Sequence, residues 1–398
     1  MRDLLYDLIL IAFIGTNFLT LIELTNITPY IFVMLIRYWN SCILYLMAAH
    51  LCLTSGELIG KVFLEEGKKY KVWKVLAILC VSIGLVYFIL QIMPRLGTEQ
   101  FYVIIGVYLI GLSYDRSFRR TVFVFLIAYS GILLFASLGL LLGYTDDCVR
   151  FTDYGAKHTF GMVHPNTAAH IIFVIVFCVW YLFLQKRRRA VYVLFWGVAV
   201  FLMVFNRCRT VILMLLAFPL LLQMMRSESL KTKRSLTGLI TLFPLVCCGI
   251  SLLLCIPIDL IHRLTYHNFL FSIGERFVQA GITLREYGLP LIGHPINSSG
   301  LIKMMVDGEK ISLFVIDNAY VSYGVIRGLV WLVPCIRFLC FAIRKAWKRL
   351  EIGLAVYGLL ICIFAFLERR GLDPAYNLLF FYPLSILRER GGSDAAEP

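Results

Sequence analysis

Most of the chain consists of long apolar stretches separated by short polar and charged segments. The stretches do not alternate between polar and apolar positions, and each runs for about 18 to 25 residues, enough for a helix to cross the hydrocarbon core of a bilayer. Because backbone N–H and C=O groups in lipid have to be paired within the segment, such stretches form helices, whereas a β-barrel would need alternating positions. The pattern predicts an all-α polytopic membrane bundle of about twelve helices.

The predicted spans make up a single transmembrane domain over residues 1–398, with no separate soluble domain. The spans are 4–22, 29–54, 73–93, 99–114, 121–143, 164–184, 190–205, 210–225, 236–257, 318–343, 351–367 and 375–387.

Composition supports the membrane prediction and excludes a soluble fold. Of the 398 residues, 60% are hydrophobic and only 16% are charged, so a soluble chain would lack the polar surface that it needs. Most of the 12 cysteines fall within predicted spans. There they act as small apolar residues, and their spacing matches neither a zinc site nor a disulfide framework.

The formal net charge of +14 does not indicate nucleic-acid binding. The Lys and Arg residues gather in short runs between spans, such as 186–189, which is where topology determinants lie. More of them fall in the segments on the side of the N-terminus than in those on the opposite side. The positive-inside rule therefore predicts that both termini are cytoplasmic.

Two long loops are predicted on the outer side, 144–163 and 258–316. We expect them to cover a functional site, because long loops of this kind usually carry function. Within the second loop, apolar residues recur at helical spacing from Gly274 to Tyr287, and polar residues occupy the other face. This segment is predicted to be an amphipathic helix on the membrane surface, with Arg276 near its start.

Asp317 and Asn318 lead directly into the predicted span 318–343. A carboxylate at a helix start is ordinary capping, which stabilises a helix by about 0.5–2 kcal/mol. The same position would also hold a general base at the membrane boundary, beside a bound lipid head group. Glu368 lies in the last outer turn, where a solvated charge is the simpler interpretation. The adjacent Asp146 and Asp147 are more typical of a solvated turn than of a metal site.

Two further outer segments carry polar side chains at helix starts. Arg207 and Arg209 lie in a tight turn, where they either extend to lipid phosphates or hold a diphosphate through forked hydrogen bonds, and both interpretations stay open. His164 and Asn166 flank Pro165 where the span 164–184 begins. They either satisfy free N–H groups or form a sugar- or phosphate-binding corner at the positive end of the helix.

These segments, taken in order, resemble the capsular-polysaccharide and O-antigen polymerase family (Wzy-like), which is related to the O-antigen ligases. The resemblance covers roughly residues 145–380 and depends on the order of the motifs and on their common outer side. In the arginine-containing turn, we take Arg209 as the match to the family's serine–arginine–threonine sequence. The matching segments are Gly161–Asn166, Arg207–Thr210, Arg276–Phe277, Asp317–Tyr320, and Glu368 with Pro374–Asn377.

The resemblance implies a fold like that of the C-type lipid-linked-sugar glycosyltransferases, and transfer on the outer face of the bacterial cytoplasmic membrane. The implied substrate is an undecaprenyl-diphosphate-linked oligosaccharide, joined into a surface polysaccharide without a cofactor or a metal ion. A flippase and a chain-length regulator are the implied protein partners. Arg209 and Arg276 would hold the diphosphate and Asp317 would act as general base. The residues implied to bind substrate are His164, Asn166, Arg150, Arg207, Asn318, Tyr320 and Glu368.

Two other functions fit parts of the pattern. A lipid-linked-oligosaccharide flippase would use polar residues within the membrane, and such residues do occur inside predicted spans: Arg37, His50, Arg327 and Arg337. An O-antigen ligase would transfer finished glycan to a different acceptor. Polymerisation is favoured because the two halves of the chain do not repeat and most ionisable residues lie at the outer edge.

Overall fold

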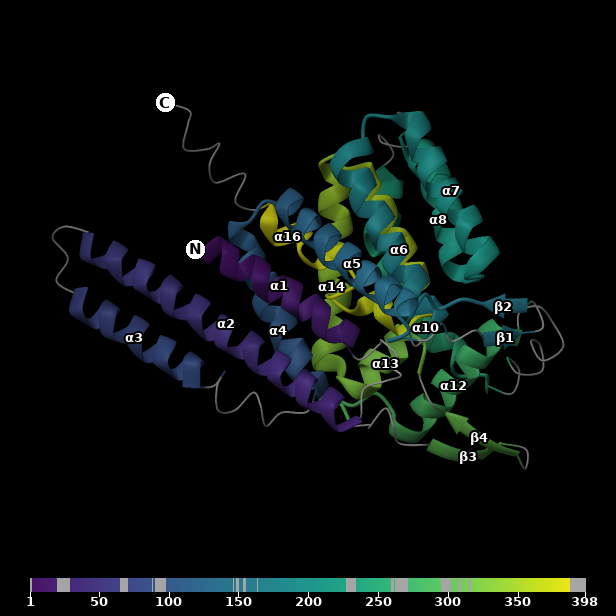
Figure 1. The fold of residues 1–398 in the computed structure, drawn as a ribbon, viewed down its shortest axis with the longest axis horizontal. Helices are drawn as coiled ribbons and strands as arrows, with labels where there is room; N and C mark the ends of the chain where they lie inside the picture. The colour runs from purple at the N-terminus through teal and green to yellow at the C-terminus, as the bar shows by residue number, and fades with distance from the viewer. Residues whose placement is uncertain are drawn as a thin grey trace. The chain divides into compact units, whose positions relative to one another are not determined.

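The structure is a computed structural model dominated by helices, with two short β-hairpins (Figure 1). It describes residues 2–19, 29–64, 71–87, 89, 98–145, 147, 150–152, 155–162, 164–226, 234–258, 261, 271–294, 302–306, 309–313 and 316–386.

Helices of membrane-spanning length confirm that this is a membrane-embedded helical protein. Among the described residues, five helices are long and apolar enough to cross a bilayer: Tyr38–Ile59, Phe118–Leu141, Pro165–Leu184, Arg188–Phe205 and Leu236–Leu254. Three shorter helices are also apolar: Val103–Leu112, Arg209–Met225 and Ile352–Phe364. The total of about twelve spans stays a prediction.

The chain folds into two compact units, residues 1–171 and 172–387. In the first unit, helix α1 packs against α2, α4 and α5, and α2 lies alongside α3 (Figure 1). Its elements are α1 (Arg2–Leu19), α2 (Pro29–Leu64), α3 (Lys71–Tyr87), α4 (Thr98–Leu112), the 3₁₀ turn η3 (Ser113–Asp115), α5 (Phe118–Leu141), the antiparallel hairpin of β1 (Arg150–Thr152) and β2 (Gly155–Lys157), and the start of α6 (Pro165–Val179).

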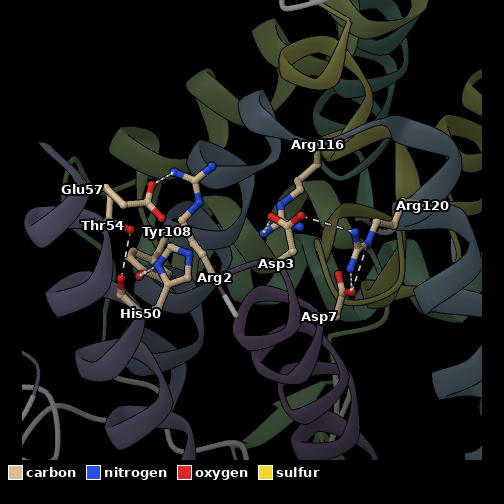
Figure 2. A network of polar contacts seen from close by, with 9 residues as sticks. All are labelled: Arg2, Asp3, Asp7, His50, Thr54, Glu57, Tyr108, Arg116 and Arg120. Carbon is tan, nitrogen blue, oxygen red and sulfur yellow. Dashed lines mark hydrogen bonds and ion pairs between the residues drawn. The ribbon is translucent and has the colours of Figure 1, made fainter. Parts of the chain in front are cut away.

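Ion pairs join α1 to its neighbours in the first unit (Figure 2). Asp3 contacts Arg116 at 2.7 Å, and Asp7 contacts Arg120 at 2.7 Å. The side chain of Arg116 is only 5% exposed, so its charge depends on this pairing more than a surface arginine would. The network therefore fixes the start of α1 against the start of α5.

His50 is one of the polar residues that the sequence places inside a span. Its Nδ1 lies 2.9 Å from the hydroxyl of Tyr108, and the side chain is buried (Figure 2). A buried imidazole with a hydrogen-bond partner is satisfied within the bundle. The pair thus links α2 to α4.

In the second unit, α14 packs against α10 and α15, and α15 packs against α8. The elements are the end of α6, the π-helical turn η4 (Trp180–Leu184), α7 (Arg188–Phe205), α8 (Arg209–Met225), α10 (Arg234–Leu254), α12 (Phe271–Tyr287), the hairpin of β3 (Ile302–Val306) and β4 (Glu309–Leu313), α13 (Ala319–Ile326), α14 (Leu329–Lys348), α15 (Ile352–Phe364), η5 (Arg369–Leu372), η6 (Leu378–Phe380) and α16 (Tyr382–Ser385).

Aromatic rings fill the centre of this second unit. Phe177 stacks on Tyr357 with ring centroids 4.1 Å apart, and Phe195 stacks on Phe218 at 4.4 Å. Trp180 completes the group, 5.0 Å from Phe218 and packed over Gly353, where no larger residue would fit. Offset and edge-to-face ring pairs of this kind add stability beyond the area that they bury.

The predicted span 318–343 is not one helix, because it breaks at Gly328 into α13 and α14. Gly328 has a φ of 82°, which a residue with a side chain rarely adopts. The segment 290–294 enters the break and forms backbone hydrogen bonds there: Leu329 N–H to Pro290 O at 2.9 Å and His294 N–H to Val325 O at 2.9 Å. The break therefore leaves these backbone groups satisfied.

The predicted span 375–387 is also wrong as a continuous helix. The described part contains only the three-residue turn η6 and the four-residue helix α16, which are too short to cross a bilayer. The run is apolar because it is buried within the protein, with Leu378, Phe381 and Tyr382 all fully covered. Apolar composition alone does not distinguish burial in protein from exposure to lipid.

Gly293→Ala is expected to destabilise the protein, because a Cβ at Gly293 would overlap the carbonyl of Ile326 and lie 2.6 Å from the Cα of Arg327. Overpacking of this kind costs about 1–3 kcal/mol. The measurement is the thermal unfolding midpoint of the purified protein in detergent. Gly197→Ala is the control, since no atom lies within 4 Å of its added Cβ and its midpoint should hold or rise. Equal midpoints for both variants would contradict the described packing of 290–294 in the break.

Candidate functional site

A buried arginine, Arg276, lies between two carboxylates in the second unit. Its Nη1 is 3.0 Å from Oε1 of Glu368, and its Nε is 3.4 Å from Oδ2 of Asp317. Nη1 also donates to the carbonyl oxygen of Leu367. The Arg276 side chain is 20% exposed, that of Asp317 31% and that of Glu368 7%, so the cluster is largely shielded from water but reachable on the Asp317 side.

Helix α12 brings Arg276 to this place. The sequence predicts that its apolar face rests on the membrane surface, but in the structure this face packs against α13 and the end of α10. Phe277 and Ala280 are buried in that contact, and a Cβ at Gly281 would collide with the carbonyl of Cys255. The close approach of α12 to Cys255 therefore requires a glycine, and it helps to fix the helix that carries Arg276.

Asp317 is held by the residues that follow it in the sequence. Asn318 is fully buried and caps α13, accepting a hydrogen bond from Val321 N–H at 3.1 Å, and it also bonds to Ser251 of α10. Tyr320 is equally buried, and its hydroxyl donates to Cys362 O at 2.8 Å. Both residues are predicted from the sequence to bind substrate. Their burial and internal bonds help to position Asp317, and their binding of substrate stays a prediction.

Glu368 comes to the cluster from the end of α15. Its backbone N–H donates to Phe364 O at 2.9 Å, which continues the helical turn, and its side chain then turns toward Arg276. The preference of the sequence analysis for a solvated charge at this position is wrong, because Glu368 is only 6% exposed.

Burial and pairing act in opposite directions on the three charges. Burial raises the pKa of Asp317 and that of Glu368 above their usual ranges, although Arg276 and Arg370 oppose the rise. Burial disfavours the charge of Arg276, but Glu368 and Asp317 outweigh it and raise the Arg276 pKa. A carboxylate whose pKa is raised is a stronger base than a solvent-exposed aspartate, so it is better suited to accept a proton.

Arg370 is a second cation near the cluster, and it is not among the site residues predicted from the sequence. It lowers the pKa of both Asp317 and Glu368, and its guanidinium lies 5.4 Å from the ring centre of Tyr376. The Glu368-Arg369-Arg370 sequence alone does not show which arginine faces inward, because the 3₁₀ turn η5 determines that orientation.

The turn before α8 lies within electrostatic range of this cluster. The Cys208 thiol is among the groups that influence the pKa of Arg276. Asn206 fixes the turn by accepting a hydrogen bond from Cys208 N–H at 3.2 Å, and Arg207 adopts a φ of 56°. Arg209 is exposed in the first turn of α8. Cys208 therefore lies near Arg276, whereas a role for Arg209 in the same site stays a prediction.

The remaining predicted site residues belong to the first unit. His164 caps α6, with its Nδ1 accepting from Asn166 N–H at 3.2 Å and its carbonyl accepting from Thr167 N–H at 3.1 Å. This geometry matches the helix-start interpretation of His164 and Asn166. Arg150 lies in β1, and its side chain is outside the described part of the structure. A role for these residues in binding substrate stays a prediction.

The same loop contains a hydrogen-bonded pair of side chains that the sequence does not predict. Asp147 bonds to Nδ1 of His158 and accepts from the N–H groups of Thr159 and Phe160 at 2.6 and 3.2 Å. Burial opposes ionisation here, but the hydrogen bonds from His158 and Thr159 outweigh it and lower the pKa of Asp147. A spacing of eleven residues across a hairpin gives no local sequence signal of the pairing. Asp146 lies outside the described residues.

Within the described part of the chain, no group of three or more His, Cys, Asp or Glu side chains is placed to hold a metal ion. The comparison of the chain with models of known protein families, with curated proteins and with solved structures finds no match.

Arg276→Met is expected to destabilise the second unit, because Glu368 would be left buried without its cation. Breaking a buried pair in this way costs about 3–5 kcal/mol. The double variant Arg276→Met/Glu368→Gln should recover much of that loss. The denaturation midpoints of the two variants, measured in detergent, provide the check. Arg285→Met, an exposed position on the same helix, should leave the midpoint near that of the wild type. A double variant less stable than Arg276→Met would refute the pairing.

Proposed function

We propose that the chain is a polysaccharide polymerase of the Wzy-like kind, acting on undecaprenyl-diphosphate-linked oligosaccharides at the outer face of a bacterial cytoplasmic membrane. The observation that carries this proposal is the convergence of Arg276, Asp317 and Glu368, with Cys208 of the turn before α8 close enough to influence Arg276. It unites cations able to hold a diphosphate with a carboxylate able to accept a proton.

In the proposed reaction, a hydroxyl group of the acceptor repeat unit attacks the anomeric carbon of the donor chain. A new carbon–oxygen bond forms, and the bond between that carbon and the diphosphate oxygen breaks. The hydroxyl proton passes to Asp317, and undecaprenyl diphosphate leaves with the electron pair of the broken bond. Because diphosphate is a good leaving group, the protein mainly has to position it and stabilise its growing negative charge.

Binding of the donor would also activate the base if the donor's diphosphate replaced the two carboxylates as the partner of Arg276. Before binding, Arg276 is engaged by Asp317 and Glu368. A diphosphate that takes over the guanidinium removes its stabilising effect on both carboxylates, so their pKa values rise further. Asp317, the more exposed of the two, then becomes the stronger base at the moment when the leaving group is in place.

His164 and Asn166 are proposed to bind the sugar. Arg150 and Arg207 are proposed to assist Arg209 at the diphosphate. A flippase that delivers the donor, and a protein that limits chain length, are the proposed partners. Both termini are proposed to be cytoplasmic.

A second candidate function, lipid-linked-oligosaccharide transport, is favoured by one specific observation. The break between α13 and α14 has Arg327 beside it, with its guanidinium 4.1 Å from the ring centre of Tyr323. Discontinuous helices with a charge nearby are common in transporters. A flippase variant would leave the substrate on the inner leaflet, whereas a polymerase variant would leave single repeat units on the outer face. An O-antigen ligase variant would change attachment and leave chain length unaltered.

Asp317→Asn is expected to abolish polymer while leaving single lipid-linked repeat units at the cell surface, because the asparagine cannot accept the proton. Loss of a general base lowers the rate by about 10²–10⁴-fold. Sizing the surface glycan of cells that express each variant gives the measurement. Glu286→Gln, an exposed carboxylate on α12, is the matched control and should give wild-type chain lengths. Wild-type chain lengths from Asp317→Asn at equal protein level would remove Asp317 as the base.

Polymerisation by the reconstituted protein is expected to rise with pH, because the base has to be ionised. Since burial raises the pKa of Asp317, this rise should occur above the range of an ordinary aspartate. Glu368→Gln should move the rise to lower pH, because one negative neighbour is removed and Arg276 remains for Asp317. A rate profile that Glu368→Gln shifts toward higher pH would contradict the proposed coupling of the two carboxyls.

A further inference from the structure

Helices α7 and α8 form a hairpin that encloses a cavity at its open end. The tight turn at 206–208 joins the helices at one end, so the start of α7 and the end of α8 lie together at the other. The cavity there has a volume of about 350 Å³, within the range of small-ligand sites. Its lining includes Arg188, Arg189 and Arg226.

The three arginines give this cavity a positive charge that none of its described lining residues compensates. No Asp or Glu is among the described residues that line it. Arg226 donates to the carbonyl oxygen of Gln185 at 3.4 Å, which satisfies one N–H group but neutralises no charge. Burial and the nearby Arg188 both lower the pKa of Arg226, so the guanidinium groups lie close enough to repel one another. Like charges held together in a cavity favour an anion between them.

The rest of the cavity and its surroundings are apolar or amphipathic. Leu222 lines the wall, and the hydroxyl of Tyr192 donates to the Gln223 side chain across the two helices. Elsewhere on the two helices, apolar side chains are exposed, such as Val193 (74%) and Met224 (62%). Both helices have membrane-spanning or near-spanning apolar composition, so their exposed surface is suited to contact with acyl chains. An anion that reaches the arginines while its own apolar part lies along this surface is a lipid.

We propose that this cavity binds the phosphate head group of an anionic phospholipid from the leaflet that surrounds the open end of the α7–α8 hairpin. The site is distinct from the polymerase site, since Arg209 and Cys208 lie at the opposite end of the same hairpin. It requires neither the substrate nor the reaction proposed above. Charge repulsion between the arginines would make the lipid part of the stable structure, because a bound anion relieves it.

The test titrates the full-length, delipidated protein in neutral detergent with phosphatidylglycerol or with phosphatidylcholine, and counts bound lipid by native mass spectrometry. We expect one phosphatidylglycerol to bind at least about tenfold more tightly than phosphatidylcholine, and Arg188→Gln/Arg226→Gln to lose this preference. Arg344→Gln, an exposed arginine of α14, is the matched control and should keep the wild-type preference. Inorganic phosphate at millimolar concentration should not displace the lipid.

Gln223→Trp tests the cavity itself without altering its charge. The added ring would fill part of the volume, so the preference for phosphatidylglycerol should fall as it does in the double arginine variant. Retention of the full preference by Gln223→Trp or by the arginine variant would overturn the proposal. Equal binding of the two lipids by the wild type, or an equal loss in Arg344→Gln, would also overturn it. Displacement of the lipid by inorganic phosphate would identify a site for free anions instead.

Discussion

The contact of Arg276 with Asp317 and Glu368 is the constraint on which the candidate site depends. It joins three helix ends: the start of α12, the start of α13 and the end of α15. Removing three charges from water is costly, and the cost is offset only when each charge has its partner in place. The packing of Gly281 on Cys255, the cap formed by Asn318 and the turn after Phe364 all fix a backbone so that these partners meet.

The helical character of the chain could be predicted from the apolar runs, because the length of a run and the need to pair its backbone leave few alternatives. The break at Gly328 and the burial of 375–386 could not be predicted in this way. Gly328 adopts its conformation because the segment 290–294 occupies the break, and that contact spans more than thirty residues of sequence. The run 375–386 has the composition of a span, but in the structure α14 and α15 pack against it.

The sequence suggested part of the candidate site but not all of it. Charged residues at helix ends on one side of a membrane bundle lie on the same surface, which is why Arg276 and Asp317 could be expected to lie near each other. Which neighbours face the cluster depends on local turns: η5 brings Arg370 near both carboxyls, and the cap at Asn318 turns Tyr320 into the protein. The pairing of Asp147 with His158 required knowledge of the hairpin between them.

The two charged regions of the second unit differ in one physical respect that bears on selectivity. The arginines beside the α7–α8 cavity have no carboxylate partner among its described lining residues, so any accessible phosphate gains from contact with them. Arg276 already has two carboxylate partners, and an anion gains only by offering more charge than they do. A single head-group phosphate is a poor competitor against two carboxylates, whereas a diphosphate presents more negative charge over adjacent oxygens. If the proposed function holds, the internal pairing of Arg276 keeps phospholipid head groups out of the site while still admitting a diphosphate-linked donor.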